Sequence, residues 1–158
     1  MERVNRIWNH TYYRQCLDKI SALEADREFC RHTPEHFLDV ARLTWIFAME
    51  EGLDIERGLV YAAALLHDIG RFRQYEDGTP HDVASVEIAE RLLPECGYTE
   101  QETSVIVDMI ASHRKKSSGK DIDGLFYRAD KMSRSCFLCP AERECNWSAE
   151  KKNMVIRY

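Results

Sequence analysis

Residues 59–66 of the chain read LVYAAALL, an almost uninterrupted apolar run that ends directly at His67 and Asp68. The run is apolar on most faces of a helix, as expected of a helix surrounded by others. It is far shorter than the ~20 residues needed to cross a bilayer. The sequence therefore predicts a central buried helix that ends in two polar side chains, which are costly to bury without a partner.

Helical signals dominate the rest of the chain, because glycine and proline are few and no alternating run is long enough for a confident strand. We expect an all-α bundle of about six to seven helices, with loops at RFRQYEDGTP and KKSSGKD. Thr33 and Pro34 favour a helix start, and Thr99 with Glu102 has capping-box spacing. The expected helices cover about residues 3–29, 34–51, 55–69, 81–93, 99–113 and 121–134, with a last short helix from Ser148.

The length of 158 residues and the net charge of −5 are simplest for one acidic domain, with a cysteine-rich extension at 136–158. Lysine and arginine are scattered apart from residues 114–116, which argues against an extended nucleic-acid surface but is compatible with a small anionic ligand. The amino terminus lacks the pattern of a secretory signal. We expect a cytoplasmic protein that binds no membrane; the oligomeric state is not predicted.

Four histidines and two aspartates lie at predicted helix ends, and most of them continue inward-facing apolar stripes. They are His36, His67, Asp68, His81, His113 and Asp130. Any one alone reads as a core histidine or a helix cap. Together they would place imidazole and carboxylate donors, which suit Fe, Mn, Zn or Ni, around one cavity. Periodicity does not establish that these helix ends converge.

The sequence LLHDIG on an apolar helix, preceded by His36 and followed by Ala-Asp-Lys at 129–131, resembles the HD-domain metal-dependent phosphohydrolases. The resemblance covers about residues 28–135 and implies an all-α HD-domain bundle. It implies that His36, His67, Asp68 and Asp130 bind a first metal. His81 and His113 match the further histidines of dinuclear members, in which the aspartate at Asp68 bridges the metals. The ligand order is similar to that of symmetrical diadenosine-tetraphosphate hydrolases.

The resemblance also implies an activity. A metal-activated water would hydrolyse a phosphate ester or anhydride of a small molecule such as a nucleotide, with Asp68 and His67 at the reaction centre. Two divalent ions are expected, from among Fe, Mn, Zn, Ni and Mg. Lys131 is the first choice for a further catalytic and substrate contact because Asp130 precedes it. The candidate phosphate contacts, each of which could equally be a solvated surface charge, are Arg71, Arg73, Arg114, Lys115 and Lys131.

Two other functions stay open. Some proteins of the superfamily, similar to myo-inositol oxygenase, use a di-iron site of the same ligand order to activate oxygen. A non-catalytic sensor that binds a metal or ligand would keep the fold without turnover. The absence of a GYP motif argues against the cyclic-dinucleotide phosphodiesterase branch.

The six cysteines are better interpreted as core residues or metal ligands than as disulfides in a reducing compartment. Cys136, Cys139 and Cys145 follow Asp130, and Cys30 precedes His36. If His36 and Asp130 meet, these four thiolates could bind a structural zinc or an iron–sulfur cluster. Burial as small hydrophobic residues is the alternative. The residues that could replace Cys30 as a ligand are Cys16, Cys96 and His32.

Overall fold

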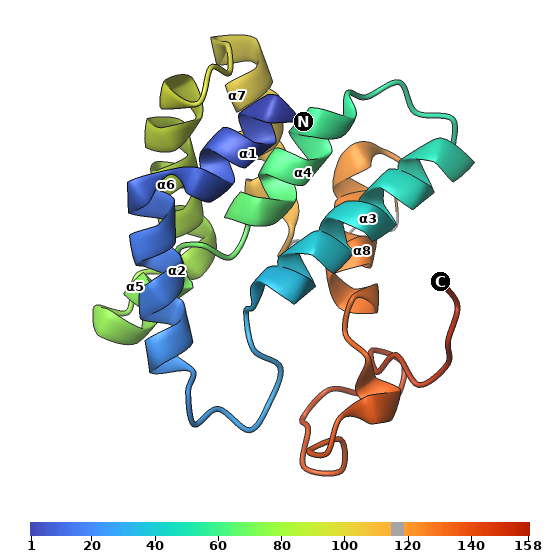
Figure 1. Ribbon diagram of the computed structural model, residues 1–158. Coiled ribbons are helices and arrows are strands. Elements are labelled where there is room, and N and C mark those ends of the chain that lie inside the picture. Colours follow the sequence, from blue (N-terminus) through green and yellow to red (C-terminus); the bar gives the residue numbers. More distant parts are fainter. Residues whose placement is uncertain (115–118) are drawn as a thin grey trace.

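A computed structural model of the protein describes residues 1–114 and 119–158 (Figure 1). Within this part the regular elements are helices and no strand is present, which confirms the all-α prediction. No helix among the described residues is both long and apolar enough to cross a membrane. The elements are α1 (Glu2–Asn9), α2 (Thr11–Leu23), α3 (Pro34–Glu50), α4 (Arg57–Leu66), α5 (Arg71–Glu76), α6 (His81–Glu95), α7 (Glu100–Ser112), α8 (Ile122–Met132) and the 3-10 turn η1 (Cys136–Leu138).

Helix α4 is the central element that the apolar run predicts. Every residue from Gly58 to Leu66 except Tyr61 is buried. It packs against α1, α3, α6 and α7, while α3 also packs along α8 (Figure 1). The turn that follows α4 therefore starts inside the bundle, and it carries His67 and Asp68.

Local capping sets where the ligand-bearing helices begin. The Thr33 side chain accepts a hydrogen bond from the backbone N–H of His36, with Pro34 at the first helical position. Thr99 and Glu102 form the predicted capping box at the start of α7. The Asp121 side chain accepts from the N–H of Gly124 at the start of α8 (2.9 Å). These caps fix the starts of three helices that carry or precede predicted ligands.

The helix predicted over 3–29, long enough to be broken, is divided in two, and it ends earlier than predicted. His10 has extended backbone angles, and its Nδ1 accepts from the N–H of Tyr12 (3.2 Å), which starts α2. Helix α2 ends at Leu23 because Glu24 turns inward, where its carboxylate accepts from the N–H of His32 (2.7 Å). Glu24, which was predicted to lie within the helix, is instead a buried hydrogen-bond acceptor.

Two shorter segments also differ from expectation. Part of the predicted RFRQYEDGTP loop is helix α5, which begins directly after Gly70. The helix predicted from Ser148 is a single turn, because Asn153 bonds to another part of the chain. Its side chain donates to the Met132 carbonyl (2.8 Å), and its own carbonyl accepts from the Phe137 N–H (3.3 Å). The KKSSGKD loop lies mostly outside the described residues.

Gly70 allows the turn after α4 to pack closely on α6. A Cβ atom built on Gly70 would lie 2.4 Å from the backbone nitrogen of Ser85, a contact that a side chain could not avoid. The Gly70 N–H also donates to the Ser85 hydroxyl (2.9 Å). The turn that carries Asp68 is thereby held against the helix that carries His81.

Candidate metal centre

The structure brings together all six predicted metal ligands. They come from the start of α3, the turn after α4, the start of α6, the end of α7 and the body of α8. All six side chains are buried. The convergence of these segments, which periodicity alone could not establish, results from the packing of α3, α6, α7 and α8 around the end of α4.

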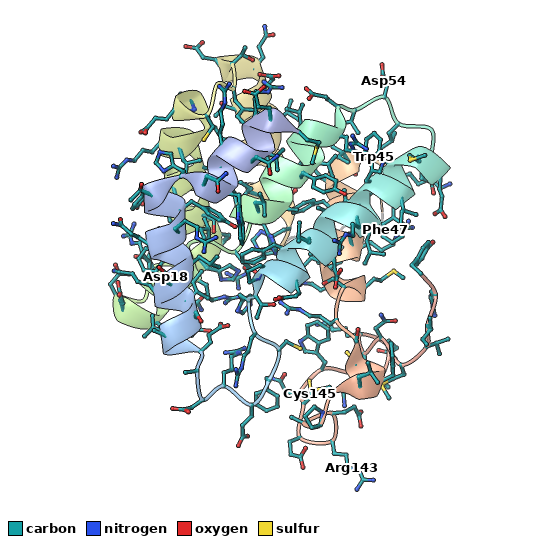
Figure 2. The ribbon with its side chains drawn as sticks, in the orientation of Figure 1. Asp18, Trp45, Phe47, Asp54, Arg143 and Cys145 are labelled. Carbon is teal, nitrogen blue, oxygen red and sulfur yellow. The ribbon has the colours of Figure 1, made fainter. Side chains whose placement is uncertain are left out.

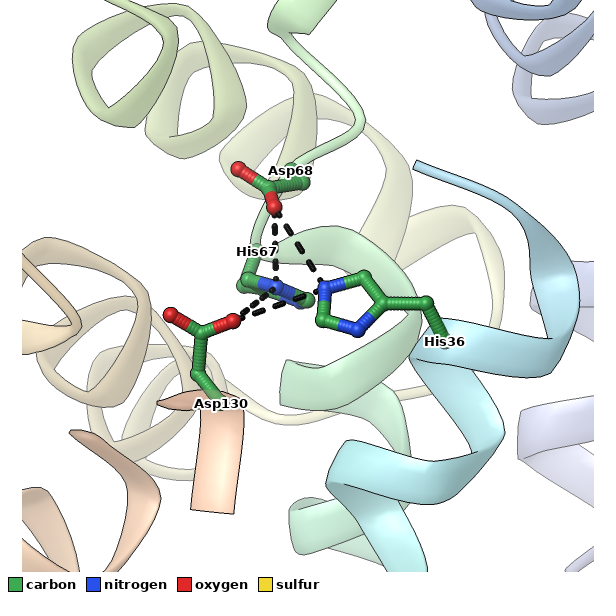
Figure 3. A group of neighbouring side chains, drawn as sticks. All are labelled: His36, His67, Asp68 and Asp130. Atoms are coloured by element: carbon green, nitrogen blue, oxygen red, sulfur yellow. Dashed lines mark ion pairs between the residues drawn. The ribbon is translucent and has the colours of Figure 1, made fainter. Parts of the chain in front are cut away.

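The first group comprises His36, His67, Asp68 and Asp130, whose ligand atoms all lie within 4.8 Å of one another (Figure 3). Asp68 Oδ2 lies 3.1 Å from His67 Nε2 and 3.7 Å from His36 Nε2. Asp130 Oδ1 lies 3.4 Å from His36 Nε2 and 3.8 Å from His67 Nε2. Two imidazoles and two carboxylates thus face one small space.

The second group uses the other oxygen of Asp68. Its Oδ1 lies 3.3 Å from His81 Nε2 and 3.7 Å from His113 Nε2, and these ligand atoms also lie within 4.8 Å of one another. Asp68 is common to both groups, with one oxygen facing each. This is the arrangement expected of a carboxylate that bridges two metal ions.

Hydrogen bonds to Nδ1 fix the orientation of the four histidines. His67 and His113 donate to the Ala64 and Ile110 carbonyls at 2.8 and 2.5 Å, and His81 Nδ1 donates to Gln74 Oε1 at 2.6 Å. Those oxygens can only accept, so the proton is on Nδ1.

His36 also carries a proton on Nδ1, which it donates to Ser133. The serine hydroxyl donates to the Asp130 carbonyl (2.7 Å), so its oxygen accepts from His36 Nδ1 (2.9 Å). All four histidines therefore direct Nε2 toward the site. Outer hydrogen bonds of this kind are typical of metal-binding histidines.

Two atoms at the centre have no hydrogen-bond partner although both are fully buried. They are His67 Nε2 and Asp68 Oδ1. A buried polar atom without a partner is costly, and Phe37 and Phe126 close the edges of the His67 ring at centroid distances of 5.5 and 5.7 Å. A divalent cation in each of the two groups would satisfy these atoms, so the residues present fit the metals that this donor set implies.

The electrostatics of the centre favour positive charge. Burial alone would lower the pKa of His67, but Asp68 and Asp130 beside it raise that pKa to about 9. Burial would raise the pKa of Asp68, yet the surrounding histidines hold it well below its ordinary value. Burial lowers the pKa of His36 and of His81 to about 3, so these ligands are neutral. The carboxylates that stabilise a proton on His67 would equally attract a divalent cation, which would bind Nε2 in place of that proton.

A fifth histidine, His32, also faces the centre, and the sequence analysis missed this role. Its Nε2 lies 3.5 Å from Asp68 Oδ2, and its Nδ1 lies 2.5 Å from Oε1 of the buried Glu24. Hydrogen bonds from His32 and Tyr75 outweigh burial and lower the pKa of Glu24 to about 2. His32 was considered only as a substitute cysteine-site ligand. Its position directly before the Thr33 cap of α3 was the signal that it lies near His36.

The predicted phosphate contacts are divided between the site and the surface. Arg71 Nη2 lies 3.5 Å from Asp68 Oδ1, and Lys131 Nζ lies 2.5 Å from Asp130 Oδ2. Arg73 pairs instead with Asp77 and Glu87, at 3.3 and 2.6 Å.

Three further cations differ in how close they lie to the centre. Arg114 pairs with Asp82, the neighbour of His81 (3.1 Å). Lys115 lies outside the described residues. Arg134, which the sequence analysis did not select, donates to His36 Nε2 (2.9 Å). Arg71, Lys131 and Arg134 therefore border the centre.

The predicted cysteine ligands lie near the same helix start. Cys30, Cys136 and Cys139 line one cavity together with His36 and Arg134. Cys16 and Cys96 are buried within the hydrophobic core instead, which removes them as substitutes for Cys30.

Comparisons with known proteins agree with this architecture. A protein of Clostridium beijerinckii described as uncharacterized is 45% identical over 158 residues, covering 100% of both chains. Ribonuclease Y of Mycoplasma mycoides is 31% identical over 117 residues, but the match spans only 25% of that protein.

A solved structure described as a predicted HD superfamily hydrolase, from an uncultured Thermotogales bacterium, has a TM-score of 0.61 with 23% identity. The alignment covers 89% of this chain and 81% of that one. The HD domain family itself matches residues 33–144, which contain all six ligands of the two groups. This chain belongs to the HD domain family.

Proposed function

We propose that this protein is a metal-dependent phosphohydrolase that cleaves a phosphate ester or anhydride of a small molecule such as a nucleotide. The observation that carries the proposal is the position of Asp68, whose two oxygens face two separate groups of buried histidines. This ligand set suits a pair of divalent ions on one bridging carboxylate.

The residues that would hold the ions are divided by the two oxygens of Asp68. His36, His67 and Asp130 would bind one ion with Oδ2, and His81 and His113 would bind the other with Oδ1. Bound divalent ions supply Lewis-acid chemistry: they lower the pKa of water and neutralise charge on phosphate oxygens. Lys131 positions Asp130 by pairing with the carboxylate oxygen that faces away from His36.

Cations at the border support an anionic substrate. Arg71 and Arg134 place guanidinium groups beside Asp68 and His36. A guanidinium binds phosphate oxygens through two parallel hydrogen bonds, and its attraction is strong where water is excluded. The net charge of −5 favours a small substrate over a long nucleic acid.

On this proposal His32 accepts a proton from the attacking water at Nε2. Its Nδ1 proton is directed to the ionised Glu24, so the Nε2 lone pair faces the centre, where it accepts a hydrogen bond from Arg71 (3.1 Å) that the water would replace. A carboxylate that orients an imidazole in this way is a common device in proton transfer. Tyr75 in turn donates to Glu24 Oε1 (2.7 Å), so the carboxylate is itself held in place.

The comparisons support the same class of reaction. One relative is named as a hydrolase of the HD superfamily and others as ribonucleases, which cleave phosphodiester bonds. The chain spans about a quarter of the ribonuclease's length, so the ribonuclease's whole activity does not follow from the match.

The experiment is an anaerobic screen of the manganese-loaded protein against nucleotides and phosphomonoesters, with release of phosphate or of a phosphomonoester as the readout. We expect release without oxygen from the native chain and from Asp108→Ala, whose side chain is exposed on α7. Asp68→Ala should release none. Oxygen consumption with an organic substrate would instead indicate an oxygenase, and tight nucleotide binding without turnover under any metal would indicate a sensor.

A further inference from the structure

Residues 133–158 have too little buried surface to explain their fixed conformation. Across this segment Cys136 alone is buried, and the one regular element is the single turn η1. Ordering a residue costs roughly 1–2 kcal/mol of backbone entropy, which burial of apolar side chains usually offsets. Small segments without such a core are typically held by disulfides or a metal. All six cysteines of this chain are free thiols.

Consecutive turns bring three cysteines of this segment together. The Cys139 N–H donates to the Cys136 carbonyl (3.1 Å), the Glu142 N–H donates to the Cys139 carbonyl (3.2 Å), and the Cys145 N–H donates to the Glu142 carbonyl (3.3 Å). Cys30 arrives from the loop between α2 and α3, where it shares a cavity with Cys136 and Cys139. Figure 2 shows Cys145 in the loops below α8, on the same side of the molecule as the segment between α2 and α3.

Two cations lie beside these cysteines, although the pKa of the Cys30 thiol is raised overall. Burial raises the pKa of Cys30, the Arg134 guanidinium lowers it, and the other three cysteines raise it further, so the four sulfurs lie within electrostatic reach of one another. Lys152 lies close enough for Cys145 and Cys136 to raise its pKa, after the larger effect of its hydrogen bond to Glu142. Two cations therefore flank a group of four thiols.

The four cysteine sulfurs do not form the tight group that a single zinc ion requires. A single zinc with bonds of about 2.3 Å would hold four sulfurs about 3.8 Å apart. Among the described residues, which include all six cysteines, no three cysteine sulfurs lie within 4.8 Å of one another. In a [4Fe–4S] cluster each thiolate binds a different iron, so the sulfurs stand farther apart than around one zinc.

We propose that Cys30, Cys136, Cys139 and Cys145 bind an iron–sulfur cluster, separate from the two-metal centre. The cluster ties the α2–α3 loop to residues 133–145. It thereby fixes the segment that carries His32, two residues after Cys30, and the segment that carries Arg134, two residues before Cys136. Arg134 already joins the two segments, because it donates to the Arg31 carbonyl (2.7 Å). Its role is structural, and no electron transfer is required.

The test is anaerobic purification of the full chain followed by measurement of iron, zinc and acid-labile sulfide. We expect about four sulfides per chain. The labile sulfide is the decisive readout, because iron alone could come from the histidine centre. Cys139→Ser and Cys145→Ser should lose it, whereas the matched variants Cys16→Ala and Cys96→Ala, which alter buried cysteines elsewhere, should keep it.

Far-ultraviolet circular dichroism accompanies each variant, because loss of sulfide counts only if the helices persist. If both serine variants unfold, the native chain is stripped of iron and reconstituted with ferrous iron and sulfide. Uptake with visible charge-transfer absorption would support the cluster. Stoichiometric zinc without sulfide, sulfide retained in the folded serine variants, or a folded apo-protein that takes up no cluster would each overturn it.

Discussion

The histidine centre and the cysteine segment meet at the start of α3, but they are held in place by different means. The histidine ligands lie at ends of helices whose apolar faces form one buried core. Residues 133–158 contribute Cys136 as their only buried residue and are joined mainly by hydrogen bonds in turns. In the first region burial places the ligands, and in the second we infer that the ligands and their cluster place the chain.

This difference has a consequence for metal removal. The four histidine ligands are oriented by backbone carbonyls, Ser133 and Gln74, so their geometry persists without an ion. The cysteine segment has no comparable framework. Loss of its cluster should loosen residues 133–158 while α1–α8 remain folded.

The largest expected effect is that of Asp68→Ala, which should remove the metal of the histidine centre and leave that of the cysteine segment. The variant loses the carboxylate common to both ligand groups, so both divalent ions and the phosphatase activity should be lost together. The acid-labile sulfide should remain, since no cysteine is altered. Metal analysis and phosphate release from one preparation measure both. A variant that keeps two ions and full turnover would contradict the assignment of the site.

A second prediction contrasts packing in the two regions. Phe37 is fully buried against His67, and Phe37→Ala should lower the free energy of unfolding by about 3–5 kcal/mol. Leu138, in η1, is 75% exposed, and Leu138→Ala should change it by about 0.5 kcal/mol or less. Chemical denaturation followed by circular dichroism gives both values. Equal losses would mean that residues 133–158 share the core's stability.

Local patterns predicted much of the helical framework. Thr33 and Thr99 cap the helices that they were expected to cap, and the run at 59–66 forms the central helix. The misplaced boundaries depended on contacts distant in sequence. Helix α2 ends where Glu24 turns to His32. The helix propensities of residues 11–29 could not predict this end, because it depends on a hydrogen-bond partner eight positions away.

The candidate site shows the same division. The convergence of the six ligands could be predicted because the resemblance supplied a topology, which periodicity alone does not give. Arg134 was missed because its contact with His36 spans 98 positions of the chain. His32 was assigned to the neighbouring cysteines, since spacing placed it near both centres and only the direction of its ring, fixed by Glu24, distinguishes them.

The third prediction concerns that direction. Glu24→Gln replaces the ionised partner of His32 by a neutral amide, and kcat should fall about 10–100-fold, the usual effect of losing such an outer hydrogen bond. The two divalent ions should remain, because Glu24 belongs to neither ligand group. Glu28→Gln, an exposed neighbour in the same loop, is the control. A kcat within twofold of the native value would remove His32 from the reaction.

The smallest effect distinguishes two arginines of the same short helix. Arg71 reaches Asp68 and His32, whereas Arg73 pairs with Asp77 and Glu87 at the surface. A hydrogen bond to a charged group contributes about 1.5–3 kcal/mol, so Arg71→Ala should raise KM for the best substrate by at least about tenfold. Arg73→Ala, a change of the same size two residues away, should alter KM less than about twofold, because solvated ion pairs contribute little. Steady-state kinetics of the two variants decides the question. Equal KM values for the two variants would show that Arg71, despite its position beside the buried centre, has no role in binding phosphate.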